Sequence, residues 1–273
     1  MRPEAGDIAV PPFPAGTAWI GAEPSSVERL CARGPLLVHF IDAAHFSSVR
    51  TLPYVRAWAQ RYRGRGLSTI GVNSPRFPFT GEPGKLAAAL SRLGIEYPVA
   101  ADARYALWHD YGCEGWPSLF LWGVGGALRW FHFGEGEYRA TEQAIQAELR
   151  AADPMLDVPE PLEPLRPSDE PGALVAPPSE EVFPGGAPSE PMIAGRGTAP
   201  LELEYEAGGV WSSVDGVGQL RVRLDGRPKE PIEVVAPGAY ELADHRRHGS
   251  HHLSLAASPG LAIYSVGFAA GIP

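Results

Sequence analysis

A nearly continuous apolar run, PLLVHFI at residues 35–41, restricts the fold of this chain more than any other stretch. A strand of this composition is typical of a sheet that is covered on both faces. The stretch that follows places Val49, Leu52 and Val55 at helical spacing and ends at Gly64 or Gly66, either of which can stop a helix. A buried strand followed directly by a helix predicts an α/β domain.

The alternation of strand-like and helix-like stretches continues to about residue 152. The sequence predicts further strands at 67–72 and 97–100, a hairpin of strands 118–122 and 127–133 joined by GVGG, and helices at 86–93, 104–111 and 141–151. Residues 1–152 are therefore predicted to form one domain with a mixed central sheet and flanking helices.

A Pro-rich, acidic stretch without any period follows at residues 153–200. It holds nine acids against two arginines, and so carries seven of the nine net negative charges of the 273-residue chain. We interpret it as a linker, and its scattered apolar side chains indicate that parts of it lie packed on the folded surface. The acidity argues against nucleic acid as a partner and identifies no other.

Strict alternation of apolar and polar residues marks the last part of the chain, residues 201–273. LELEYEA at 201–207 places leucine and tyrosine on one face and three glutamates on the other, and QLRVRLDG at 219–226 does the same with arginines. Such strands predict a small antiparallel β-sandwich. Tyr205, Trp211, Tyr240 and Tyr264 could stack on a sugar ring there, but aromatic side chains at alternating positions are more often part of the core.

No segment resembles a secretory signal or a membrane helix. Residues 1–16, MRPEAGDIAVPPFPAG, are interrupted by proline and acid, and no later stretch approaches the roughly 18 apolar residues of a membrane span. We therefore expect a soluble, cytoplasmic protein without membrane insertion. Cys31 and Cys113 are too few for a disulfide scaffold or a Cys-rich zinc site, and we expect both thiols to stay reduced and far apart.

Several motifs resemble those of a thioredoxin-fold redoxin. LLVHFIDAAHFSSVRTLPYVRAW combines a buried strand, a turn and a helix with an internal proline, Pro53, and GWPSLFLW is similar to the segment that carries the cis-proline of this superfamily. RTLPYVRAW at 50–58, HFGEGEY at 132–138 and a following β-domain similar to a carbohydrate-binding module make the chain most similar to DipZ-type cytochrome c biogenesis proteins. The resemblance implies a thioredoxin-like fold and a cis bond between Trp116 and Pro117.

The resemblance also shows a departure, because the two redox cysteines of the family are replaced. Counted back from Pro53, the second cysteine position is Ser48 and the first is His45. Neither residue carries sulfur, so dithiol exchange cannot run at this turn. We therefore expect a non-catalytic binding or assembly module, without cofactor or metal. A polypeptide or small ligand would lie in the groove that the family forms at the cis-proline, here with His45, Phe46, Ser48, Trp116 and Pro117.

Catalytic alternatives remain open. A thiol oxidoreductase or peroxidase would act through Cys113, four residues before Pro117, and would need an accessible, electropositive setting; otherwise Cys113 is a small buried residue at a helix end. A Ser-His-acid hydrolase could combine Ser48 with His39 or His45 and with Asp42, although spacing shows no oxyanion hole.

Metal binding is a further alternative at two places. His45 could ligate a metal, although the sequence shows no third ligand beside it. In DHRRHGSHH at 244–252, His245, His248, His251 and His252 could also hold a metal, but a polar hairpin loop is favoured. The simplest interpretation of His45 and Ser48 is that they are ordinary residues at a helix N-terminus.

Overall fold

The computed structural model describes residues 8–273, so residues 1–7 of the N-terminal segment discussed above lie outside the described residues. The chain forms two compact units, each assembled from segments that are distant in the sequence. Unit 1 contains the residues up to 42, 50–75 and 93–164, and unit 2 contains residues 43–49, 76–92 and 165–273. The domain boundaries at residues 152 and 200 remain predictions.

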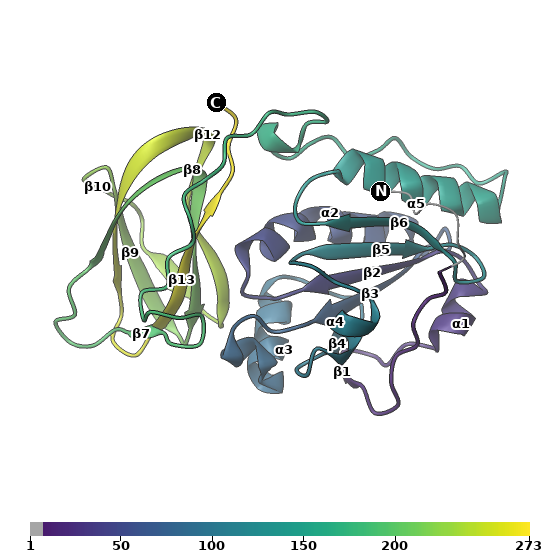
Figure 1. Ribbon diagram of the computed structural model, residues 1–273, viewed down its shortest axis with the longest axis horizontal. Helices are drawn as coiled ribbons and strands as arrows, with labels where there is room; N and C mark the ends of the chain where they lie inside the picture. The colour runs from purple at the N-terminus through teal and green to yellow at the C-terminus, as the bar shows by residue number, and fades with distance from the viewer. Residues whose placement is uncertain (1–7) are drawn as a thin grey trace. The chain divides into compact units, whose positions relative to one another are not determined.

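Unit 1 is built on a six-stranded mixed sheet with the strand order β1-β4-β3-β2-β5-β6 (Figure 1). Its strands are β1 (Ala18–Ile20), β2 (Leu36–Ile41), β3 (Ser68–Asn73), β4 (Val99–Ala101), β5 (Ser118–Trp122) and β6 (Leu128–Phe133). β2, β3 and β4 are parallel, whereas β5 runs antiparallel to β2. The antiparallel strands β1 and β6 form the two edges. This is the mixed sheet of a thioredoxin-like domain, and the predicted fold class is confirmed.

Helices cover the sheet of unit 1, which is why every residue of β2 is buried. On one face, α1 (Val27–Cys31) and α4 (Ala106–Asp110) contribute to the core cluster around β2. On the other face lie α5 (Tyr138–Ala152) and the part of α2 (Phe46–Arg63) that belongs to unit 1 (Figure 1). These two helices are joined where the Tyr62 hydroxyl donates to Glu142 at 2.6 Å and accepts from Gln146 at 2.8 Å.

Unit 2 is built on a seven-stranded antiparallel sheet with the order β10-β9-β12-β8-β13-β7, in which β11 also pairs with β9. Its strands are β7 (Met192–Ile193), β8 (Leu201–Asp215), β9 (Gly218–Leu224), β10 (Arg227–Pro228), β11 (Ile232–Val234), β12 (Gly238–Ala257) and β13 (Ala262–Ala269). The unit also contains the short helices η1 (Pro78–Gly81) and η2 (Pro167–Asp169) and the helix α3 (Pro83–Arg92).

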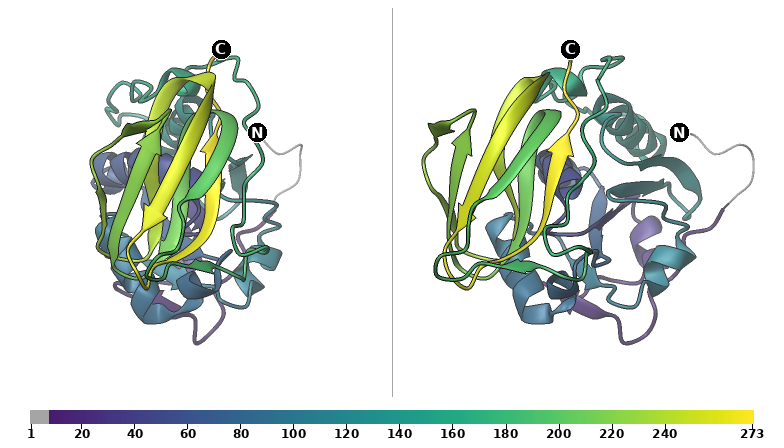
Figure 2. Two further views of the ribbon diagram at one scale, coloured as in Figure 1. Left: turned by 90° about the vertical axis from the view of Figure 1, so that its left-hand side faces the viewer. Right: turned by 60° about the vertical axis from the view of Figure 1, so that its left-hand side comes forward.

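The antiparallel β-domain predicted for the last part of the chain is confirmed, with its strands joined in one curled sheet (Figure 2). β12 pairs with β8 along most of its length and with β9 near its end. Register shifts in the β8–β12 ladder, one of them between Asp244 and Gly249, allow these long strands to bend. The four aromatic residues singled out above, Tyr205, Trp211, Tyr240 and Tyr264, are all buried, as expected for the core.

Backbone and side-chain contacts hold the Pro-rich stretch in both units. In unit 1, Gln146 Nε2 donates to the Pro159 carbonyl at 2.8 Å. In unit 2, the amide and carbonyl of Val182 exchange hydrogen bonds with those of Val266, at 2.8 and 2.9 Å. The stretch therefore follows the folded surface at these points.

Within residues 8–273, no helix combines the length and the apolar character that crossing a lipid bilayer requires. The cytoplasmic location remains a prediction.

Candidate functional site: the redoxin-like turn

Residues 43–49, which lead into α2, form the turn at which the resemblance would place the cysteines of a redoxin. They belong to unit 2. Ala43, Ala44 and Ser48 are buried, and α2 begins at Phe46. The Val49 amide donates to the His45 carbonyl at 3.1 Å, so His45 directly precedes the first helical turn. The position that would suit a thiolate at a helix N-terminus is therefore occupied by an imidazole.

The His45 imidazole is held in its neutral form. Burial and, to a smaller extent, the positive charge of Arg76 lower the pKa of His45 to about 3. A general base works best with a pKa near the pH at which it operates. The electrostatics of the turn therefore do not support a hydrolase in which His45 activates Ser48.

Strands of the β-domain cover this turn within unit 2. Ser213 Oγ, on β8, donates a hydrogen bond to the Ala44 carbonyl at 2.6 Å. On β13, a Cβ added to Gly267 would lie only 2.6 Å from Cδ1 of Phe46, so glycine lets the strand run against the aromatic ring. Ala44 also belongs to an apolar cluster, whose other buried members are Phe77, Phe79, Ala262 and Tyr264.

Two ion pairs join residues 76–92 to other parts of unit 2. Arg76 Nη2 lies 2.6 Å from Glu181 Oε2, and Lys85 Nζ lies 2.8 Å from Asp215 Oδ2. The Lys85 ammonium also reaches Glu82 at 3.0 Å. The turn, α3 and the curled sheet are thus joined by hydrogen bonds, ion pairs and apolar packing.

The Trp116–Pro117 peptide bond, in unit 1, is cis, as the resemblance implies. The Trp116 indole N–H donates to the Ser74 carbonyl at 2.9 Å, and its ring centroid lies 4.4 Å from that of Trp108. The Pro117 carbonyl accepts a hydrogen bond from the Gly134 amide at 2.7 Å. Of the five residues predicted for the binding groove, Trp116 and Pro117 therefore lie in unit 1, and the other three lie in the turn of unit 2.

Both cysteines are free thiols in unit 1. Cys113 is half-buried just after α4, where its amide donates to the Trp108 carbonyl at 3.0 Å. Burial raises the pKa of Cys113 far above its usual range, and burial together with the charge of Glu28 raises the pKa of Cys31 to about 11. Neither setting favours the thiolate that an enzyme acting through Cys113 would need.

His39 lies in the middle of β2, opposite Gly71 on one side and Leu119 on the other. It is fully buried, and neither ring nitrogen has a hydrogen-bond partner in residues 8–273. Burial lowers the pKa of His39 to about 3. His39 is thus a neutral core residue, and Asp42, just beyond the end of the strand, is buried as well.

The histidine-rich stretch at 244–252 lies inside β12, so the predicted hairpin loop is wrong. The chain makes a bulge here, with Arg246 at a φ of +61°, and then resumes pairing with β8. The strand is favoured because the facing residues of β8 include glutamates, which pair with histidine and serine across the ladder. The polar residues of 244–252 alone do not indicate that glutamates of β8 will pair with them.

The four histidines of this stretch contact different side chains. His245 stacks on His251 at 3.7 Å between ring centroids. The polar contacts are His245 Nε2 to the Tyr205 hydroxyl at 2.9 Å, His251 Nδ1 to Asp225 at 2.9 Å, His252 Nε2 to Glu202 at 3.3 Å and His248 Nε2 to Glu206 at 4.0 Å. Among the residues that the structure describes, no three or more histidine, cysteine, aspartate or glutamate side chains are grouped so as to hold a metal ion.

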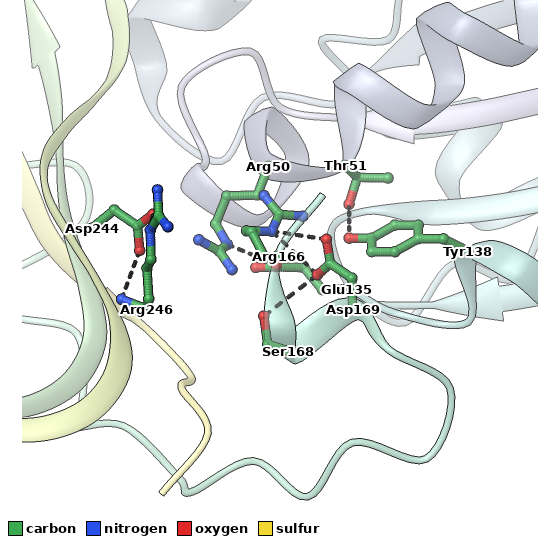
Figure 3. A network of polar contacts seen from close by, with 9 residues as sticks. All are labelled: Arg50, Thr51, Glu135, Tyr138, Arg166, Ser168, Asp169, Asp244 and Arg246. Carbon is green, nitrogen blue, oxygen red and sulfur yellow. Dashed lines mark hydrogen bonds and ion pairs between the residues drawn. The ribbon is translucent and has the colours of Figure 1, made fainter. Parts of the chain in front are cut away.

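A cluster that the sequence analysis missed joins two of its motifs in unit 1 (Figure 3). Arg50 Nε donates to Glu135 Oε2 at 2.8 Å, and the hydroxyls of Thr51 and Tyr138 are 3.2 Å apart. The Tyr54 ring stacks on that of Tyr138 at 3.9 Å between centroids. The motif RTLPYVRAW thus contacts the motif HFGEGEY, and the only sequence signal for this contact is that both resemble the same family.

The chain is similar to the protein DipZ of Mycobacterium tuberculosis, with 30% identity over 289 residues that cover 91% of this chain and 41% of DipZ. DipZ of Mycobacterium bovis matches to the same extent. The resemblance to DipZ-type proteins is thereby confirmed. The chain spans about two-fifths of the length of these relatives.

Two further similarities concern about half of the chain. NHL repeat-containing protein 2 of Bos taurus is 32% identical over 133 residues, which cover 48% of this chain and 18% of that protein. Among solved structures, a putative thiol:disulfide interchange protein DsbE from Chlorobium tepidum is 21% identical with a TM-score of 0.44, and covers 52% of this chain and 95% of its own. No family model matches the chain.

Proposed function

We propose that this chain is a redox-inactive thioredoxin-like protein that acts in binding or assembly and does not exchange disulfides. The observation that carries the proposal is the hydrogen bond from Ser213 to the Ala44 carbonyl. Through this hydrogen bond, strand β8 of the β-domain covers the turn at residues 43–49, where a redoxin would carry its reactive sulfurs. Because His45 and Ser48 also lack sulfur, the turn serves as an internal joint of unit 2.

The loop around the cis-proline is the surface we propose for an extended polypeptide. Extended chains are bound largely through backbone hydrogen bonds, so such a loop needs no cysteine to hold one. Trp116 supports this role because its ring is fixed by Ser74 and Trp108 and remains only half-buried. Unlike the turn, this surface is formed by unit 1 alone.

Disulfide exchange is tested by the reduction of insulin with dithiothreitol as the reductant. We expect the wild-type protein to be no faster than dithiothreitol alone. A His45→Cys, Ser48→Cys double variant restores both sulfurs and is expected to regain weak activity at most, because Ser213 and Gly267 still cover the turn. Adding Ser213→Ala and Lys85→Ala loosens this cover and should raise the rate. Reduction by the wild type at the rate of an ordinary thioredoxin would disprove the proposal.

Polypeptide binding is tested by hydrogen–deuterium exchange in the presence of reduced, carboxymethylated lactalbumin, which is unfolded. We expect added protection of the backbone at residues 114–118. Native lactalbumin is the matched control, since it offers no extended chain, and should leave the exchange unchanged. Equal exchange with and without the unfolded polypeptide would refute this binding surface while leaving the insulin result intact.

A further inference from the structure

Two neighbouring pockets of unit 1 lie between the outer face of α2 and the residues that precede β4. Their volumes are about 590 and 220 Å³, and they share Ala59, Arg63 and Tyr97 in their walls. Neither includes a residue of the redoxin-like turn or of the cis-proline loop. A ligand bound here would therefore serve a role beyond the function proposed above.

The larger pocket is lined by two arginines, Arg56 and Arg63, on one face of α2. They are seven residues apart, which is two helical turns or about 10 Å along the axis. Neither side chain has a hydrogen-bond or ion-pair partner among residues 8–273. One carboxylate lines the same pocket, that of the exposed Glu96. The pocket thus presents two exposed guanidinium groups against one exposed carboxylate.

Arg56 is positioned by the loop that it crosses. At Gly94 the backbone has a φ of +64°, and a Cβ there would lie 2.7 Å from Nη2 of Arg56. Glycine therefore lets the guanidinium lie against the loop at the edge of the pocket. This packing restricts the arginine, so less conformational entropy is lost when an anion binds.

Two buried hydroxyls in the pocket walls lack partners within the described part of the chain. Tyr97, which is 6% exposed, lines both pockets, and Thr69 lines the smaller one. The Tyr97 hydroxyl and Thr69 Oγ1 have no hydrogen-bond partner. Both oxygen atoms are covered by other protein atoms, so they lie behind the pocket surface.

The smaller pocket supplies an apolar wall. Besides the shared residues, its lining includes Pro24, Leu30, Leu67 and Ile70. Arginine groups at one end and aliphatic side chains at the other match a ligand with an acidic head and an apolar body.

We propose that these pockets form a binding site for a small organic anion. Its carboxylate or phosphate lies between Arg56 and Arg63, while its apolar part packs against Leu30 and Leu67. A guanidinium binds either acidic group through parallel hydrogen bonds, so the shared chemistry is that of an oxyanion.

The site is tested by calorimetric titration of the full chain with octyl phosphate, octanoate, inorganic phosphate and octanol. We expect both octyl anions to bind, and to lose about tenfold in affinity in an Arg56→Gln, Arg63→Gln variant. Tyr97→Phe should bind like the wild type, because the covered Tyr97 hydroxyl does not reach the ligand. Arg150→Gln, which changes an exposed arginine of α5, is the matched control and should bind like the wild type.

The ligands also distinguish the two kinds of acidic head. Tighter binding of octyl phosphate than of octanoate assigns a phosphate, the reverse order assigns a carboxylate, and either order supports the site. Three results would overturn it: no binding of either octyl anion at millimolar concentration, octanol binding as tightly as the anions, or equal losses in the Arg150→Gln control and the double arginine variant.

Discussion

Arg50 and Glu135 form an ion pair of 2.8 Å in which the arginine side chain is 6% exposed and the glutamate side chain 25% exposed (Figure 3). The pair joins the first turns of α2 to the segment between β6 and α5. A hydrogen bond between charged groups with this degree of burial contributes more to stability than an ion pair at the surface.

Replacing Glu135 by glutamine is expected to lower the free energy of unfolding by about 1–3 kcal/mol, because the hydrogen bond to Arg50 loses its charge on the acceptor side. Urea unfolding followed by circular dichroism measures the change. The matched control is Glu163→Gln, since the pair of Glu163 with Arg139 is 88% and 38% exposed. We expect the control to stay within about 0.5 kcal/mol of the wild type. Similar losses in both variants would contradict the prediction, because they would show that the buried ion pair contributes no more to stability than the exposed one.

The contact between β13 and the turn is tested by Gly267→Ala. The new methyl group meets the Phe46 ring, and we expect a loss of about 1–3 kcal/mol in the free energy of unfolding. Phe46→Ala in the same chain should recover part of that loss, because it removes the ring. Gly64→Ala is the control, since no heavy atom lies within 4 Å of a Cβ at Gly64. A Gly267→Ala protein as stable as the wild type would contradict this packing.

Acid should destabilise the protein through its buried histidines. His39 has a pKa of about 3 in the folded chain and an ordinary value of 6.5, so between these values the unfolded chain binds a proton that the folded chain excludes. Stability is therefore fully present above pH 6.5 and falls as the pH decreases towards 3, by about 1.4 kcal/mol per pH unit for one such group. His45 and His245 act in the same direction because the pKa of each is lowered.

The contribution of His39 is isolated by comparing the pH dependence of unfolding in wild type and His39→Leu. The variant should show a slope smaller by about 1.4 kcal/mol per pH unit below pH 6.5. His109→Gln, which changes an exposed imidazole of α4, is the control. An unchanged slope in His39→Leu would mean that His39 takes up its proton in the folded protein as easily as in the unfolded one.

Cys113 is expected to react slowly with iodoacetamide in the native protein. Because burial raises its pKa, the thiolate is scarce, and we expect a rate at least about a hundredfold below that of the urea-unfolded chain. A Cys31→Ser variant leaves Cys113 as the reacting thiol. We also expect no consumption of peroxide. Rapid native alkylation, together with peroxide loss that disappears in Cys113→Ser, would favour the enzyme over the binding module.

The sequence predicted those elements whose side-chain pattern is local. The apolar run at 35–41 corresponds to β2, and the helical spacing after it corresponds to α2 with Pro53 inside. The replacement of the redox cysteines by His45 and Ser48 stays a prediction, which depends on a short motif and its distance from Pro53. Patterns of this kind report the environment of a residue on its own strand or helix.

Contacts between distant segments could not be predicted. Ser213 and Ala44 are 169 residues apart, and nothing in either segment marks the other as its partner. The sequence of 244–252 predicts a loop because its polar residues show no apolar alternation. In the structure, Asp225 and the glutamates of β8 pair with its histidines and so allow it to form a strand. The curl of the second sheet depends on register shifts in the β8–β12 ladder, which leave no period in the sequence.

The membership of residues 43–49 and 76–92 in the unit of the β-domain affects what happens when the chain is cut. Removal of residues 165–273 would strip Ala262 and Tyr264 from the cluster that they form with Ala44, Phe77 and Phe79. The aromatic surface left behind would promote self-association, because exposed apolar patches of this kind are aggregation-prone. The β-domain thus supplies the side chains that keep Phe77 and Phe79 covered, and a chain cut before residue 165 is expected to self-associate.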